Sequence, residues 1–232
     1  MLTIKIEMWL DFTCPYCYIG KRKLDKALEE FENKDAFKVE YKSFDTTLRE
    51  NLKNGEIIQP IWKEKHNLST RQFENYINEL HKEGKLNGID FHLEGLKKTN
   101  TFHAHRLVKY AEKYDKQSEV VERLFYNYFE KQKNIEEHEV LKSLGSEIGF
   151  DNSAIEELLC MNKYDKKVKS DQIIAEELEV KAVPFLIFDD LFAMTDELSI
   201  EGFLEALSET WQRSTEKLAN KNETTYCADD TC

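Results

Sequence analysis

Three early segments of the chain differ in the spacing of their apolar residues. Residues 2–8 alternate strictly between apolar and polar side chains, which is typical of a β-strand with one buried face. From residue 14 to 31 the apolar residues recur at the three- and four-residue spacing of a helix, and residues 37–42 alternate again. The pattern predicts strand, helix and strand, the order of a βαβ unit.

The middle of the chain, residues 46–165, has helical spacing throughout. Apolar residues share one face in each of the segments 107–114, 121–128 and 140–148. Gly149 follows the last of these segments, at a position where glycine commonly ends a helix. We therefore expect a block of helices after the βαβ unit.

The pattern then returns to mixed helix and strand. A helix is predicted over 166–178, followed by a buried strand in the apolar run 180–188 and a hairpin partner over 191–194. Ser199 is placed to cap a last helix. Residues 214–232 are polar and are predicted to form a flexible tail that ends in two cysteines.

The charge and the lengths of the apolar runs argue against nucleic-acid and membrane partners. The chain has 232 residues, of which 34% are charged, and its net charge is -12. We expect no nucleic-acid partner, because phosphate binding requires clustered Lys and Arg. The chain does not open with a basic segment and a long apolar run, and its longest buried-looking run, 182–188, is too short to span a bilayer. These features predict a cytoplasmic protein with no membrane partner.

Two of the five cysteines are closely spaced at the predicted junction of the first strand and the first helix, in the order Cys14-Pro15-Tyr16-Cys17. Thr13 is the predicted N-cap, and Pro15 is compatible with a first helical turn. A thiolate at a helix N-terminus is stabilised by backbone amides, and its pKa can fall from about 8.5 to about 3.5–7.5. Cys14 is therefore the predicted nucleophile, and Cys17, one turn later, the predicted resolving thiol.

Zinc binding and inert core thiols are the alternatives for this pair. A four-cysteine zinc site usually has two closely spaced pairs, whereas Cys227 and Cys232 are separated by four residues. His103 and His105 would point apart on a helix. We therefore expect no metal, and we predict that Cys160 is a partly buried structural thiol.

Pro184 interrupts the apolar run 180–188, where it removes one hydrogen bond from a strand. A strand at the edge of the sheet or a β-bulge would explain a proline at this position. Alternatively, the Val183–Pro184 bond is cis, a rare feature that usually has a functional reason.

Four segments together resemble the DsbA-like branch of the thioredoxin superfamily, and in particular its cytoplasmic FrnE-like members. They are residues 11–24, 100–107, 182–187 and 227–232. The resemblance implies an α/β thioredoxin-like fold with a large helical insertion. Residues 1–45 and 166–213 would form the thioredoxin-like domain, residues 46–165 the insertion, and residues 214–232 the tail.

The resemblance also implies roles for individual residues. Pro184 would be cis and lie beside Cys14, and the Val183 backbone would pair with an extended substrate. Cys227 and Cys232 would form a second redox pair. Further substrate contacts are expected from residues beside the cysteines and from the helical block: Phe12, Pro15, Tyr16 and His105.

The function implied is thiol-disulfide exchange with protein or small-molecule thiols and disulfides. No resident cofactor is expected, and glutathione is a candidate redox partner. The alternative of the same fold is a kappa-class-like glutathione transferase or a 2-hydroxychromene-2-carboxylate isomerase, which uses a single serine or cysteine. Cys17 argues against that alternative, because a resolving thiol would be superfluous. A zinc-dependent binding module is a third, non-enzymatic alternative.

Overall fold

The computed structural model describes residues 2–44, 55–195 and 199–226. The chain begins with strand β1 (Ile4–Leu10), helix α1 (Pro15–Glu30) and strand β2 (Phe37–Ser43). The two strands are parallel, with Ile6 opposite Val39. The predicted βαβ unit is confirmed.

The sheet is completed by two short strands from the far end of the chain, β3 (Phe185–Phe188) and β4 (Phe192–Thr195). β3 is antiparallel to both β1 and β4, and the strand order is β2-β1-β3-β4. The residues at the hairpin turn, Asp189 and Asp190, have φ angles of 47° and 56°, which suit the tight turns that match strand twist. The predicted strand 180–188 is too long, because the ladder begins only after Pro184, which has no N–H to donate.

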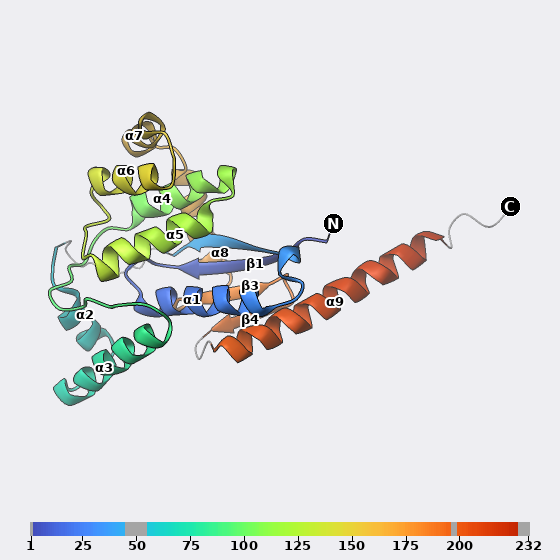
Figure 1. The fold of residues 1–232 in the computed structure, drawn as a ribbon, viewed down its shortest axis with the longest axis horizontal. Coiled ribbons are helices and arrows are strands. Elements are labelled where there is room, and N and C mark those ends of the chain that lie inside the picture. Colours follow the sequence, from blue (N-terminus) through green and yellow to red (C-terminus); the bar gives the residue numbers. More distant parts are fainter. Residues whose placement is uncertain (1, 45–54, 196–198, 227–232) are drawn as a thin grey trace.

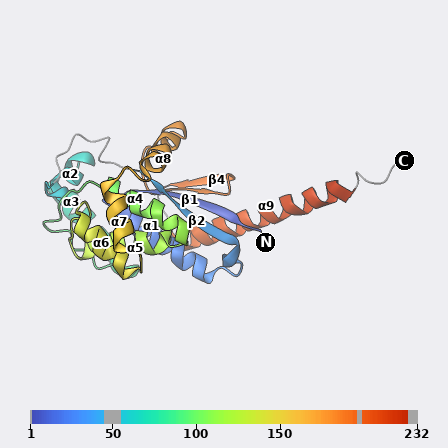
Figure 2. The ribbon, with the colours of Figure 1, turned by 90° about the horizontal axis from the view of Figure 1, so that it is seen from above.

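Helices cover both faces of the sheet (Figures 1 and 2). α1 packs with α9 (Ile200–Tyr226) against the face that carries Ile6 and Met8. α8 (Asp165–Glu177) lies on the opposite face, where Ala175 packs with Trp9. The predicted cap of α9 is confirmed, since the Ser199 hydroxyl accepts the Gly202 N–H at 2.9 Å.

A long helical segment is inserted between β2 and α8. It contains α2 (Ile58–Lys65), α3 (Thr70–Leu86), α4 (Phe102–Ala111), α5 (Gln117–Phe125), a π-helical turn (Tyr126–Glu130), α6 (His138–Glu147) and α7 (Asn152–Cys160). In Figure 1, α4 to α7 lie together along one side of the sheet, whereas α2 and α3 lie near the N-terminal end of α1. The predicted α/β fold with a helical insertion is confirmed.

A buried ion pair joins the insertion to the sheet and to α8. The Lys109 ammonium on α4 lies 2.5 Å from the Asp171 carboxylate on α8. The same carboxylate accepts the Ser43 N–H of β2 at 2.6 Å, and Lys109 donates to the Tyr41 carbonyl at 2.8 Å. Because each charge has several partners, these interactions offset the free-energy cost of removing the two charges from water.

Two predictions about the chain are wrong. Residues 214–226 are not a flexible tail, because α9 continues to Tyr226 and projects beyond the body of the molecule (Figures 1 and 2). The segment contains no Gly or Pro, so no residue in it breaks the helix. Cys160 is also exposed, at the last position of α7, instead of partly buried. Cys227 and Cys232 lie outside the described residues.

Candidate active site

Cys14 itself is the N-cap of α1, one residue later than predicted. Its backbone is extended, with φ −95° and ψ 112°, and Pro15 occupies the first helical position, where no N–H is needed. The chain enters this position through a turn in which the Cys14 N–H donates to the Asp11 carbonyl at 3.1 Å. The sulfur therefore stands where Ser or Asp side chains usually accept the free N–H groups of a helix.

The surroundings of Cys14 lower the pKa of its thiol. The largest cause is a hydrogen bond from the Cys17 thiol, and the backbone N–H groups of Cys17 and Tyr16 add to it. Burial and the negative charge of Asp11 act in the opposite direction but do not outweigh these donors. The thiolate, the reactive form of cysteine, is thus favoured at this position.

Cys17 has the opposite environment. Its side chain is fully buried on α1, and burial raises its pKa well above the usual value. The hydrogen bond that it gives to Cys14 and the charge of Cys14 raise it further. The two thiols, both free in the structure, therefore form an asymmetric pair, in which the half-buried one ionises first.

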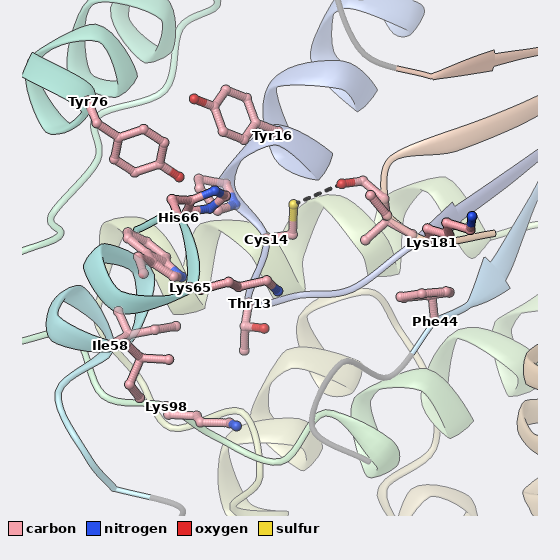
Figure 3. Close-up of a pocket in the computed structure, with 15 residues that line it drawn as sticks. Thr13, Cys14, Tyr16, Phe44, Ile58, Lys65, His66, Tyr76, Lys98 and Lys181 are labelled. Carbon is pink, nitrogen blue, oxygen red and sulfur yellow. Dashed lines mark hydrogen bonds between the residues drawn. The ribbon is translucent and has the colours of Figure 1, made fainter. Parts of the chain in front are cut away.

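The segment before β3 lies directly against Cys14. The Val183–Pro184 peptide bond is cis, as predicted. The protonated Cys14 thiol donates to the Val183 carbonyl at 3.4 Å (Figure 3). The structure thus brings together residues 169 positions apart in the chain.

A cavity of about 340 Å³ opens beside Cys14. Pro15 and Tyr16 line it from the first turn of α1, Thr13 and Cys14 from the turn before that helix, and Val183 from the segment before β3. The predicted contact residues Pro15, Tyr16 and Val183 are therefore on the cavity wall, and Tyr16 is 42% exposed.

Phe12 and His105 do not line this cavity. Both are buried, with their rings 4.9 Å apart, and Phe12 also packs on Phe125 of α5 at 5.1 Å. Direct substrate contact does not fit this position. Their contact instead joins the loop before Cys14 to the helical insertion.

The helical insertion contributes a wall that the sequence analysis missed. His66, the C-cap of α2, packs near Tyr76 of α3 with ring centroids 5.5 Å apart (Figure 3). Trp62 of α2 lies 6.4 Å from the same Tyr76 ring. Tyr16 packs edge-on against the same Tyr76 at 6.0 Å. The helical spacing of Trp62 and His66 predicts a shared face. Nothing in the sequence indicates that this face covers Cys14.

Lysine residues also line the cavity without having been predicted. They are Lys65, Lys98 and Lys181, which come from three separate segments of the chain. Among the described residues, no group of three or more His, Cys, Asp or Glu side chains is arranged to hold a metal ion. Within the same ranges, no helix combines the length and the apolar character needed to cross a membrane.

The fold and the site define a class: thioredoxin-fold proteins with a dithiol at the first helix and a helical insertion. The sequence matches the DSBA-like thioredoxin domain over residues 5–208. The chain therefore belongs to the family of DSBA-like thioredoxin domains. A protein of Bacillus subtilis (strain 168), YwbO, is 24% identical over 190 residues, which make up 82% of this chain and 88% of that protein.

Several solved structures share this fold. A probable DsbA oxidoreductase from Streptomyces coelicolor has a TM-score of 0.83 and 23% identity, with 90% of each chain covered. The cytosolic disulfide reductase DsbM from Pseudomonas aeruginosa has a TM-score of 0.61 and 15% identity over 90% of this chain and 98% of that one. A 2-hydroxychromene-2-carboxylate isomerase has a TM-score of 0.61 and 18% identity over 93% and 98%. At these identities the likenesses show the fold alone.

Proposed function

We propose that this protein is a dithiol-disulfide oxidoreductase that acts on protein disulfides through Cys14 and Cys17. The observation that carries the proposal is the opposite environment of the two thiols: the pKa of accessible Cys14 is lowered, and the pKa of buried Cys17 is raised. A nucleophile and a resolving thiol require this difference.

The proposed reaction has two steps. The Cys14 thiolate attacks one sulfur of a substrate disulfide, which forms a mixed disulfide and releases the first substrate thiolate. Cys17 then loses its proton and attacks the Cys14 sulfur, which releases the second substrate thiol and leaves a Cys14–Cys17 disulfide. Two electrons pass from the protein to the substrate, and the reverse sequence oxidises a substrate dithiol.

The segment beside Cys14 supports an extended protein substrate. The segment that contains Val183 precedes β3 and lines the cavity, so substrate backbone can pair with it as an added strand. The alternative function, glutathione transfer or isomerisation with a single thiol, shares the fold of the isomerase structure but leaves the buried Cys17 without a role.

Insulin reduction in the presence of dithiothreitol tests the proposal. We expect Cys14→Ser to lower the rate to that of dithiothreitol alone, and Cys17→Ser to slow turnover; when pre-reduced Cys17→Ser is mixed with insulin after dithiothreitol is removed, a mixed disulfide between Cys14 and insulin should accumulate. The exposed Cys160 provides the matched control, and Cys160→Ser should retain full activity. Activity that survives Cys14→Ser would refute the proposed function.

A secondary redox pair at Cys227 and Cys232, FrnE-like membership and a cytoplasmic location stay predictions. The pair can be tested in the same assay with a Cys227→Ser, Cys232→Ser double variant. If Cys227 and Cys232 exchange electrons with Cys14 and Cys17, the double variant should turn over more slowly, and the alkylation rate of Cys14 should not change.

A further inference from the structure

The insertion side of the cavity is joined to α1 by a ring contact close to Cys14. The ring of Tyr76, in the first half of α3, packs edge-on against the ring of Tyr16, with the two centroids 6.0 Å apart. Tyr16 belongs to the first turn of α1, and both rings line the cavity. Figure 3 shows the two tyrosines on one side of Cys14 and Lys181 on the other. The contact therefore lies at the edge of the cavity, beside the reactive sulfur.

The same Tyr76 ring holds the end of α2 against α3. The rings of His66 and Trp62 lie 5.5 Å and 6.4 Å from it, and the ring of Phe73, one turn earlier on α3, stacks on it at 6.0 Å. We refer to the end of α2 and the first half of α3, residues 62–76, as the flap. Because Tyr76 also contacts α1, its ring connects the flap to the helix that carries the two cysteines.

Burial along α3 indicates which part of the helix can move. Its buried residues, Leu80 and Gly84, both lie in the second half, and a Cβ at Gly84 would clash with a neighbouring aromatic ring. Between residues 70 and 76, all of which the structure describes, no side chain is fully buried. A helical segment with few buried contacts opens at a lower free-energy cost than one that is packed in a core. The first half of α3 is therefore the part that opens most easily.

Both ends of the flap are anchored to the rest of the molecule. Before the flap, the Ile58 N–H donates to the Leu96 carbonyl at 2.9 Å. After the flap, the Lys23 ammonium of α1 lies 2.9 Å from the Glu83 carboxylate of α3. The contact of Tyr76 with α1 lies between these two anchors. Breaking this contact lets the flap bend away from Cys14 while both anchors stay in place.

The cavity is small for a protein disulfide. Its volume of about 340 Å³ lies at the lower end of the range for small-molecule sites, about 300–1,000 Å³. A disulfide within a protein brings backbone and side chains on both sides of each sulfur. With the flap against α1, the cavity therefore admits a small disulfide more readily than a protein disulfide.

We propose that Tyr76 limits the size of the disulfides that reach Cys14: its contact with Tyr16 holds the flap closed, and a protein disulfide reacts only after this contact opens. Tyr76 is thus a specificity-determining residue that acts through the position of the flap. The inference rests on the proposed function and adds what selects among its substrates.

The strength of the ring contact sets the size of the expected effect. An edge-on pair of aromatic rings contributes free energy equivalent to roughly a twofold to tenfold change in an equilibrium constant. When opening precedes the reaction with a protein disulfide, loss of the contact raises that rate constant by the same factor. A small disulfide enters with the flap closed, so its rate constant follows the reactivity of the thiolate alone.

The test compares the reaction of the reduced full-length protein with insulin and with 2-hydroxyethyl disulfide, which is small and neutral. Acid quenching and mass spectrometry of the Cys14–Cys17 peptide give the two second-order rate constants, and their ratio cancels any change in the reactivity of the thiolate. We expect Tyr76→Leu, which removes the ring and keeps an apolar side chain, to raise the ratio of insulin to small disulfide roughly twofold to tenfold. Tyr76→Phe keeps the ring, so its ratio should stay within roughly twofold of the wild-type value.

Phe73→Leu is the matched control. Phe73 stacks on Tyr76 within the flap but is not among the residues that line the cavity. Both Leu variants remove one ring from the flap, and only Tyr76→Leu removes the contact with α1. A ratio that rises equally in both variants would show a general loosening of the flap and would overturn the role of Tyr76.

Alkylation gives a second measurement that does not depend on disulfide exchange. N-ethylmaleimide and a maleimide that carries a polyethylene glycol chain differ in size, and the exposed Cys160 reports the intrinsic difference between the two reagents. We expect Tyr76→Leu to raise the reaction of Cys14 with the large reagent, relative to the small one and to Cys160, by roughly twofold to tenfold.

An unchanged or lowered ratio in Tyr76→Leu, in either measurement, overturns the inference. If the reduced wild-type protein reacts with neither disulfide while the alkylation ratio of Tyr76→Leu still rises, the proposed function fails and the size limit set by Tyr76 stands.

Discussion

The hydrogen bond between the two thiols makes a sharp prediction about Cys14. Replacing Cys17 by Ala removes the largest single cause of the lowered pKa and leaves the backbone N–H groups of Tyr16 and Cys17 in place. A hydrogen bond to a charged group contributes about 1.5–3 kcal/mol, and one pKa unit corresponds to about 1.36 kcal/mol. We therefore expect Cys17→Ala to raise the pKa of Cys14 by about 1–2 units.

A matched variant separates the hydrogen bond from the loss of the second sulfur. Cys17→Ser keeps a hydroxyl donor at the same position, so the pKa of Cys14 should stay within about half a unit of the wild-type value. Both variants remove the resolving thiol, and only the Ala variant removes the donor.

The measurement is the rate of iodoacetamide alkylation of Cys14 as a function of pH. Mass spectrometry of the peptide that contains Cys14 separates it from the exposed Cys160. Because only the thiolate reacts, the midpoint of the curve gives the pKa. An unchanged midpoint in Cys17→Ala, or equal shifts in the Ala and Ser variants, would refute the assigned hydrogen bond.

Two further predictions concern the scaffold. Asp171→Asn leaves the Lys109 ammonium buried beside a neutral amide and should lower the free energy of unfolding by about 3–5 kcal/mol, measured by urea denaturation. A loss below about 1 kcal/mol would show that the ion pair does not join α4 to α8. A Cβ at Gly145 would clash with the Ile155 Cδ1 atom, so Gly145→Ala should lower the free energy of unfolding by about 1–3 kcal/mol, and the double variant Gly145→Ala, Ile155→Val should recover part of that loss. An unchanged melting temperature in the single variant would contradict the close packing of α6 on α7.

Local patterns in the sequence were sufficient for the framework that carries the dithiol. The alternation over residues 2–8 and 37–42 predicted β1 and β2, because a strand with one buried face has a period of two residues. The Cys-Pro-Tyr-Cys spacing predicted a nucleophile at a helix start, and the structure places Cys14 there. The exact cap depended on Pro15, which takes the first helical position and moves the N-cap from Thr13 to Cys14.

Local sequence patterns did not predict which polar segments are helical or which aromatic side chains are buried. Residues 214–226 looked like a tail because they are polar, yet a polar segment without Gly or Pro can extend a helix that has already started, such as α9. Phe12 was expected at the substrate surface because it is next to the motif. Its burial follows from packing against Phe125, a residue of the insertion more than a hundred positions away.

The sequence by itself determined where the two thiols lie: two cysteines at helical spacing at a helix N-terminus are a local arrangement, and the Cys17 thiol and the backbone amides of the same turn lower the pKa of Cys14. Only the tertiary structure decided what surrounds them. Trp62, Tyr76 and Lys65 come from the insertion, and Lys181 and Val183 come from the segment before β3. Their distance from Cys14 depends on how the helices pack on the sheet, which no local spacing of residues records.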